Sequence, residues 1–128
     1  ILKAMCDRHN KNYYKKYKEW CDEYFYLPHR KEARGIGGIF FDYKNDSFEY
    51  DFKFVRDVGV TFQILFNEII KKKREKKWTL RDKELQYIKR GLYTEFNLLY
   101  DRGTKFGLQT GGNVEGILMS LPPIAKWK

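Results

Sequence analysis

The 128-residue sequence contains few of the residues that disulfide scaffolds and metal sites require. It has two cysteines, two histidines and three prolines, and the cysteines do not form a CxxC motif. The histidines are far apart and do not form an HExxH motif. A disulfide framework or a zinc site is therefore not expected, and a reducing compartment suits the chain better. We expect Cys6 and Cys21 to be buried thiols.

Long apolar runs are also lacking. No stretch is long enough to cross a bilayer, and no basic-then-apolar leader with a small-residue cleavage site is recognisable. We expect a soluble chain without a membrane span, with enough residues for one domain. Because helix-like sequence starts directly at Ile1, we also expect the chain to be part of something longer.

Positive charge is abundant, with a formal net charge of +9 and a pI near 9.5. This balance favours an anionic partner but does not identify it. Lysines cluster near residues 15–18 and again over residues 71–77. Runs of this kind are often solvated faces or ends of helices, so they do not by themselves indicate a binding site.

Five segments show sequence features of helices. Apolar residues recur at three- and four-residue intervals over residues 1–8, 11–26 and 48–70, and Ser47 is a suitable N-cap for the long third segment. Thr79 and Asp82 resemble a capping box that starts a helix to about Arg90, where Gly91 is expected to stop it. A short helix over residues 114–121 should end at the two prolines that follow.

Two segments are expected to be strands. Ile36 to Phe41 is a short apolar run between glycine-rich and turn-forming flanks, which is typical of a buried strand. Residues 92–100 are rich in aromatic residues and are interrupted by polar ones, which favours a strand with one polar side. Residues 101–113 hold four glycines and are expected to be largely loop. The order of elements predicts a sheet covered by helices.

The stretch HRKEARGIGGIFFDY is the first candidate site. It places His29, Arg30 and Arg34 ahead of three glycines and a predicted strand that ends in Asp42. Glycines allow a ligand to approach the backbone, but their spacing is not the GxGxxG of dinucleotide-binding proteins. The block therefore indicates a polar site at the entrance of a strand.

The stretch YDRGTKFGLQTGGN is the second candidate site. An Asp-Arg pair, Asp101 and Arg102, leaves a predicted strand and enters a glycine-rich loop, a favoured position for functional residues. The sequence has no GxSxG motif, so no serine nucleophile is indicated. From the residues alone, the chain is an anion-binding domain.

Three blocks together carry a resemblance to a known family: KEWCDEYFYLPHR, the overlapping HRKEARGIGGIFFDY, and EFNLLYDRGTKFGLQTGGNVEGILMSLPPIAKW. They resemble the oxygen-dependent coproporphyrinogen III oxidases. The resemblance covers nearly the whole chain and is weakest from about residue 44 to residue 90. It implies that residues 1–128 are the C-terminal part of a single oxidase domain in an enzyme about twice as long.

The resemblance implies an α+β fold in which a flat antiparallel β-sheet is sandwiched between α-helices, with only part of that fold in this chain. It also implies a homodimer that forms through the region matching Tyr93 to Trp127. The expected location is the cytoplasm, or an organelle in many eukaryotes. No nucleic-acid partner is expected.

The reaction implied is the oxidative decarboxylation of two propionates of coproporphyrinogen III to vinyl groups, a step of haem biosynthesis. O2 is the co-substrate and no cofactor is required, although a divalent metal has been considered in bacterial members. The family's candidate metal ligand falls on His29, and its substrate-contacting glycines and amide fall on Gly111, Gly112 and Asn113.

Chemistry assigns the remaining roles. Arginine holds carboxylates in a fixed register through its forked donors, so Arg30, Arg34 and Arg102 are candidates for binding propionates. A base that deprotonates a pyrrole N–H would start the reaction, and Asp101 is the first choice for it. Asp42 is the second choice.

Two other interpretations remain open. The chain could be a dimerising fragment without catalytic activity of its own. Alternatively, its positive charge and many aromatic residues would suit a nucleic-acid-binding module, whose affinity for any oligonucleotide should depend strongly on salt.

Overall fold

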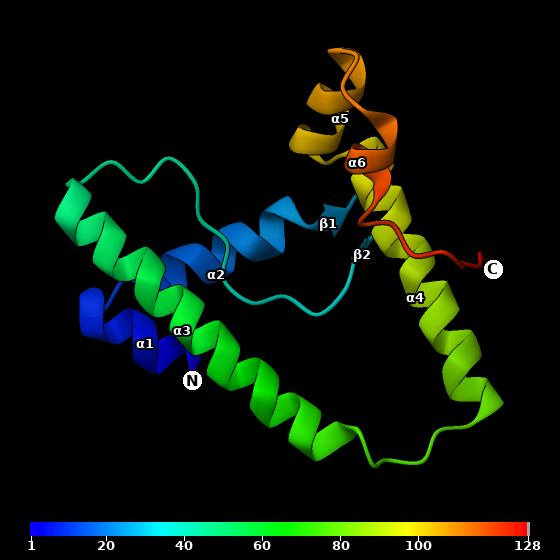
Figure 1. Cartoon of the computed structure of the whole chain (residues 1–128), viewed down its shortest axis with the longest axis horizontal. Helices are drawn as coiled ribbons and strands as arrows, with labels where there is room; N and C mark the ends of the chain where they lie inside the picture. The colour runs from blue at the N-terminus through cyan, green and yellow to red at the C-terminus, as the bar shows by residue number, and fades with distance from the viewer. Residues whose placement is uncertain (128) are drawn as a thin grey trace. The chain divides into compact units, whose positions relative to one another are not determined.

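The computed structural model describes residues 1–127, which divide into two compact units (Figure 1). Unit 1 consists of Ile1–Tyr24 and Gly37–Lys77. Unit 2 consists of Phe25–Ile36 and the chain from Trp78 onward. The backbone therefore leaves unit 1 for a short excursion into unit 2, returns, and then completes unit 2.

Unit 1 contains three helices: α1 (Leu2–His9), α2 (Tyr13–Tyr24) and α3 (Phe48–Lys73). They confirm the predicted helices within a few residues at each end. The Ser47 hydroxyl accepts a hydrogen bond from the backbone N–H of Tyr50 at 3.3 Å, as expected for an N-cap. Lysines occupy the last turn of α3, where positive charge complements the helix dipole.

The core of unit 1 forms where α1, α2 and α3 meet around Phe54, which is fully buried. The rings of Tyr13 and Tyr17 lie with their centroids 5.1 and 5.6 Å from that of Phe54. Cys6 and Cys21 are buried free thiols, which confirms their predicted place in the core. Burial raises the pKa of the Cys6 thiol, so this side chain packs as an apolar group.

The predicted strand at Ile36 to Phe41 is wrong, because this segment forms no strand in the part of the chain that the structure describes. Its apolar side chains still serve the core: Ile39 and Phe41 pack against the cluster around Phe54. The backbone N–H of Phe40 donates to the carbonyl of Tyr17 at 3.0 Å. A strand requires a neighbouring strand to pair with, and here the segment packs against α2 instead.

Unit 2 begins with a two-stranded antiparallel hairpin that the sequence did not reveal. Strand β1 (Tyr26–Leu27) pairs with β2 (Glu32–Ala33), and the register places Tyr26 opposite Ala33. Pro28 opens the turn, and Lys31 adopts a φ of 56°. Strands this short give no alternating pattern, and the second half of the turn depends on a lysine in a conformation that lysine seldom adopts.

Helix α4 (Leu80–Leu99) dominates the rest of unit 2. The predicted capping box is confirmed, because Thr79 accepts from the backbone N–H of Asp82 and Asp82 accepts from that of Thr79. These hydrogen bonds from Thr79 lower the pKa of the Asp82 carboxyl. The helix continues through Gly91, so the predicted stop at this glycine is wrong.

The predicted strand over residues 92–100 is also wrong, because most of this segment belongs to α4. Leu92 and Phe96, four residues apart, are both buried on one helix face. Thr94 and Asn97 donate from their side chains to the carbonyls of Arg90 and Tyr93, one turn back. Polar and β-branched residues that suggested a strand are thus accommodated by local bonds along the helix.

The predicted loop at residues 101–113 is largely helical: α5 (Arg102–Gln109) occupies most of it, and α6 (Val114–Leu118) follows. Gly107 is needed within α5, because a Cβ there would lie 3.0 Å from the side chain of Ile117 in α6. The glycines therefore allow two short helices to pack closely. The predicted helix over 114–121 is confirmed in its first part.

The architecture is α+β in a coarse sense, being mostly helical with one small antiparallel sheet. Among the helices of residues 1–127, none has both the length and the apolar character needed to cross a membrane.

Gly91 and Gly59 provide a matched test of the packing of α4. A Cβ at Gly91 would lie 2.4 Å from the carbonyl oxygen of Lys126, whereas a Cβ at Gly59 of α3 meets nothing within 4 Å. Gly91→Ala should lower the free energy of unfolding by about 1–3 kcal/mol through overpacking. Gly59→Ala should raise it by roughly 0.5–1 kcal/mol through better helix propensity. Urea unfolding of both variants checks this, and stabilisation by Gly91→Ala would show that Lys126 does not approach α4.

Candidate functional site

Glu95 lies at the centre of the most densely bonded polar cluster described in unit 2. It projects from α4 near Leu92 and Phe96, which face the hairpin. The ring of Phe25, just before β1, lies 5.1 Å from that of Phe96 between centroids, and this contact holds the hairpin on the helix. The Glu95 side chain is only 12% exposed, so its charge must be compensated by protein groups.

Arg30 and His29, in the turn of the hairpin, supply that compensation. Arg30 donates from Nε to Glu95 Oε2 at 2.9 Å and from Nη2 to Oε1, a two-point contact. His29 Nε2 lies 2.7 Å from the same Oε2. These hydrogen bonds, that from Arg30 foremost, lower the pKa of Glu95 to about 2. The pair likewise raises the pKa of Arg30.

The second nitrogen of His29 extends the cluster to the end of α4. Nδ1 lies 2.8 Å from the hydroxyl of Tyr100, the residue that caps the helix. Carboxylate, imidazole and phenol therefore form a continuous chain of hydrogen bonds. Such a chain fixes the orientation of the imidazole and can move a proton along its length.

This arrangement does not fit a metal at His29. Both ring nitrogens already have partners, and the nearest carboxylate is bound by Arg30. Nowhere in residues 1–127 do three histidine, cysteine or carboxylate side chains gather as a metal site would require. Metal ligation by His29 stays a prediction that the donor set of this chain does not support.

Arg34, predicted to bind substrate, lies among aromatic rings of unit 2. Its guanidinium carbon is 4.1 Å from the ring centroid of Phe25, 5.0 Å from that of Tyr93 and 5.2 Å from that of Phe96. Stacking on aromatic faces is a favoured environment for a guanidinium group. The structure thus gives Arg34 a packing role next to the Glu95 cluster.

Asp101 and Arg102 lie directly after Tyr100, at the start of α5. The Asp101 carboxylate caps this helix by accepting from the backbone N–H of Thr104 at 2.7 Å. Arg102 is the first residue of the helix. Asp101, the predicted base, therefore also stabilises α5. A substitution that tests its catalytic role must keep the helix cap.

Gly111, Gly112 and Asn113 connect α5 to α6. Gly111 has a φ of +72°, which favours glycine, and the N–H of Gly112 donates to the carbonyl of Gly107 at 2.9 Å. Asn113 Oδ1 caps α6 by accepting from the N–H of Glu115 at 3.0 Å. All three residues thus shape a tight connection between two helices. Asp42 belongs to unit 1.

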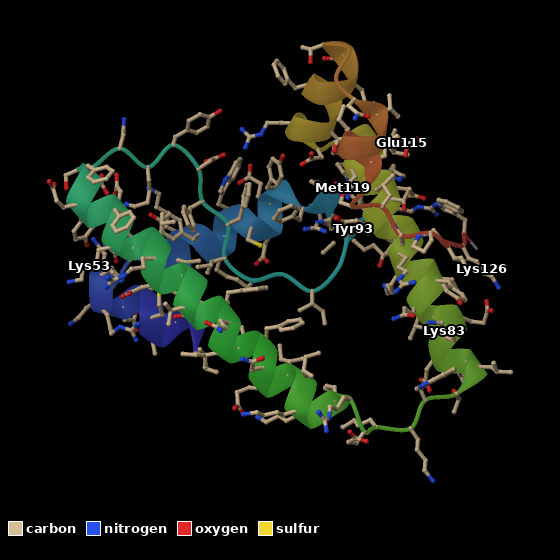
Figure 2. All side chains as sticks on the ribbon, in the orientation of Figure 1. Lys53, Lys83, Tyr93, Glu115, Met119 and Lys126 are labelled. Carbon is tan, nitrogen blue, oxygen red and sulfur yellow. The ribbon has the colours of Figure 1, made fainter. Side chains whose placement is uncertain are left out.

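A cavity of about 180 Å³ opens beside the Glu95 cluster. Its charged lining includes Arg30, Lys89 and Lys126, and the remaining lining residues are Glu32, Leu85, Ile88, Leu92 and Trp127. Lys89 Nζ lies 3.0 Å from Glu32, and Lys126 Nζ lies 2.7 Å from Glu84. Figure 2 shows Lys126 on the C-terminal segment that runs alongside α4. Each cation of the lining is therefore paired with a carboxylate, and the cavity combines three ion pairs with an apolar floor.

Sequence reasoning found His29 and Arg30 but missed their partners. Glu95, Tyr100 and Lys89 are separated from the hairpin by 57 to 71 residues, so no local motif joins them. The presence of Glu95 in an otherwise apolar stretch was a usable signal. It was interpreted as the polar side of a strand, and only the fold shows what it contacts.

The fold and site together define a basic, mostly helical α+β chain with a cluster of ion pairs and a small cavity in its second unit. Comparison with known proteins then gives the family. The family model described as coproporphyrinogen III oxidase matches residues 1–128, and the chain belongs to this family. The resemblance seen in the sequence is thereby confirmed.

Curated relatives agree with this assignment. The chain is 60% identical over 127 residues to the oxygen-dependent coproporphyrinogen-III oxidases of Rickettsia rickettsii and Rickettsia bellii, and 59% identical to that of Rickettsia akari. Each match covers 98% of this chain and 46% of the relative. The chain therefore spans about half the length of the curated relatives it matches.

The depressed pKa of Glu95 leads to a pH-dependent stability. Because the pKa is about 2 in the folded chain and about 4.3 in an unfolded one, the ionised carboxylate stabilises unit 2 fully above about pH 5. This contribution is lost as the pH falls from about 4.3 towards 2. Glu95→Gln should lower the free energy of unfolding by about 1–3 kcal/mol at pH 7 and flatten its decline in acid.

Urea unfolding between pH 2 and pH 7 measures this effect. Glu84→Gln is the matched control, because Glu84 is half-exposed and pairs with Lys126 at the surface. Surface pairs contribute little, so the control should change stability by less than about 1 kcal/mol. Equal effects of the two substitutions would contradict the central position of Glu95.

Proposed function

We propose that this chain functions as part of an oxygen-dependent coproporphyrinogen III oxidase. The carrying observation is the 60% identity over 127 residues to oxidases of Rickettsia that have this name. The whole enzyme would convert two propionates of coproporphyrinogen III to vinyl groups and release protoporphyrinogen IX. The step belongs to haem biosynthesis. The alternative is that this chain contributes a non-catalytic, dimerising half.

The proposed reaction is balanced by O2. Each propionate loses its carboxylate as CO2 and a hydride equivalent from the side-chain carbon attached to the pyrrole ring, which leaves a C=C bond between the two side-chain carbons. Two propionates supply four electrons, and with four protons these reduce one O2 to two molecules of water. Two of those protons come from the substrate carbons as part of the hydride equivalents, and two come from solvent. No organic cofactor is required by this balance, and O2 is the oxidant.

The basic cavity of unit 2 supports the binding of an acidic tetrapyrrole. Arg30, Lys89 and Lys126 line it, and the last two make exposed ion pairs that a propionate can replace at little cost. Leu85, Ile88 and Trp127 offer an apolar surface to a pyrrole ring. We propose this cavity as the place where one propionate and its pyrrole bind, and Arg34 and Arg102 as further contacts of the substrate.

Asp101 is our proposed base for the pyrrole N–H, with Arg102 beside it and Asp42 as the second choice. The position of Asp101 supports a fixed orientation, because its carboxylate caps α5 and follows Tyr100 directly. Gly111, Gly112 and Asn113 form a tight turn, and its two glycines carry no side chain that would keep a ligand away from the backbone. We propose that this turn contacts the substrate.

The remaining features of the family are proposals for this chain. We propose a cytoplasmic homodimer assembled through residues 93–127, in which a flat antiparallel sheet is sandwiched between helices. Residues 1–128 would be the C-terminal part of its single domain. The helices of this chain support such a cover for a sheet.

Asp101→Asn tests the proposed base without removing the helix cap, because asparagine caps helices as well as aspartate does. The experiment uses a chimaera in which this chain replaces the matching region of the Rickettsia rickettsii oxidase. Loss of the base should lower kcat about 10²–10⁴-fold while thermal stability stays within about 0.5 kcal/mol. Turnover of coproporphyrinogen III in air is followed by the fluorescence of protoporphyrin after oxidation.

Asp101→Ala serves as the companion variant. It removes both charge and cap, so it should lose about 1 kcal/mol of stability in addition to activity. Full turnover by Asp101→Asn would exclude Asp101 as the base. An inactive parent chimaera would instead count against the proposed function itself.

A further inference from the structure

Helix α3 has one buried apolar face and, besides it, many exposed apolar side chains. Phe54 and Thr61 lie on the buried face, which contacts the rest of unit 1. A second set of apolar residues lies on another side of the helix, and each member is between 41% and 79% exposed. We call this set the α3 stripe: Phe48, Phe52, Val55, Phe62, Phe66, Ile69 and Ile70. Two other apolar residues, Val60 and Ile64, are about half exposed on the side of the helix away from the stripe.

The spacing of the α3 stripe follows the helix period. At about 100° per residue, all seven side chains fall within an arc of about 100°, centred about 110° from Phe54. The stripe extends over about 33 Å, nearly the full length of α3 (Figure 2, where Lys53 marks its first half). Phe48 stacks on Phe52 and Phe62 on Phe66, each pair with centroids 5.9 Å apart. The stripe therefore consists of two apolar clusters on one side of the helix, separated by the turn that contains Gly59.

The exposed apolar area of the α3 stripe is comparable to the area that one partner buries in a protein interface. Seven half-exposed large side chains present roughly 700 Å² of apolar area, more than the largest patch on a typical monomer. Stable interfaces bury about 800 Å² on each partner. A hollow of about 410 Å³ lies at the N-terminal end of the stripe, lined by Lys44, Asn45, Ser47, Phe48, Asp51, Phe52 and Val55. The α3 stripe thus adjoins a hollow at its N-terminal end.

The length of the relatives indicates the occupant. The matched oxidases contain about as much polypeptide again as this chain, since the match covers 46% of each. A helix with apolar residues on two sides is typical of a position between two layers of a core. We infer that the α3 stripe is the surface on which the other half of the oxidase polypeptide packs.

This inference goes beyond the proposed activity and stands on the family assignment. Association can therefore be measured without turnover, and an inactive complex would count against the proposed function while leaving the interface in place.

The experiment co-expresses this chain with the portion of the Rickettsia rickettsii oxidase that lies outside the matched 127 residues. We expect a one-to-one complex by size-exclusion chromatography with light scattering. Phe62→Asp with Phe66→Asp places two charges in the stripe, and it should raise the dissociation constant roughly 100-fold or more. A second variant, Phe48→Asp with Phe52→Asp, changes the hollow at the N-terminal end of the stripe and provides an independent test.

The matched control is Val60→Asp with Ile64→Asp. Both are half-exposed apolar residues of α3 with the same four-residue spacing, and they lie about 130–170° around the helix from the centre of the stripe. The control adds the same two charges and should change the dissociation constant less than about threefold. Circular dichroism of each isolated variant should match that of the unsubstituted chain.

Four results would overturn the inference. The first is the absence of a complex, and the second is a complex that stripe and control variants weaken equally. The third is unfolding of the isolated chain by the stripe substitutions, which would mean that the stripe is already covered within the chain. The fourth is a stripe-dependent homodimer, or stripe-dependent binding to anionic vesicles, that persists when the other half is supplied.

Discussion

The negative charge of a mostly buried carboxylate must be compensated by protein groups. In unit 2 this carboxylate is that of Glu95. Arg30 and His29 compensate it from the turn of the hairpin. Because a largely buried charge left without its partner is costly, the hairpin cannot move far from α4 without a loss of stability. The same contact fixes Tyr100 through His29, and Tyr100 immediately precedes the Asp101 cap of α5. The geometry of the candidate site thus depends on one ion pair.

Local signals in the sequence predicted the starts of α3 and α4 correctly. Ser47 caps a backbone N–H three residues later, and Thr79 and Asp82 are three residues apart. The local sequence therefore contains all the information that these caps need. Gly91 was misjudged because its role depends on Lys126, which lies 35 positions later in the sequence. The strand predicted at Ile36 to Phe41 failed for a related reason, since a strand is defined by a neighbour that local sequence does not specify.

The sequence predicted which residues belong to the candidate site but not which residues they contact. His29, Arg30 and Asp101 stand out by their neighbours in sequence, and the resemblance to a family drew attention to the same positions. The structure adds what each contacts: Arg30 binds Glu95, Arg34 stacks on aromatic rings, and Asp101 caps a helix. These tasks are compatible with the proposed chemistry. They also mean that activity lost on substitution must be separated from stability lost.

The hairpin of unit 2 lies in the sequence between the two segments that build unit 1. Its bonds to Glu95 close loops of 65 and 66 residues, whereas the caps of α3, α4 and α5 form within a single turn. Loop closure of that length has an entropic cost and slows the formation of non-local contacts. During synthesis, the hairpin therefore leaves the ribosome long before its partner helix exists. The helices of unit 1 are complete first, and unit 2 assembles as the last turns of α4 emerge.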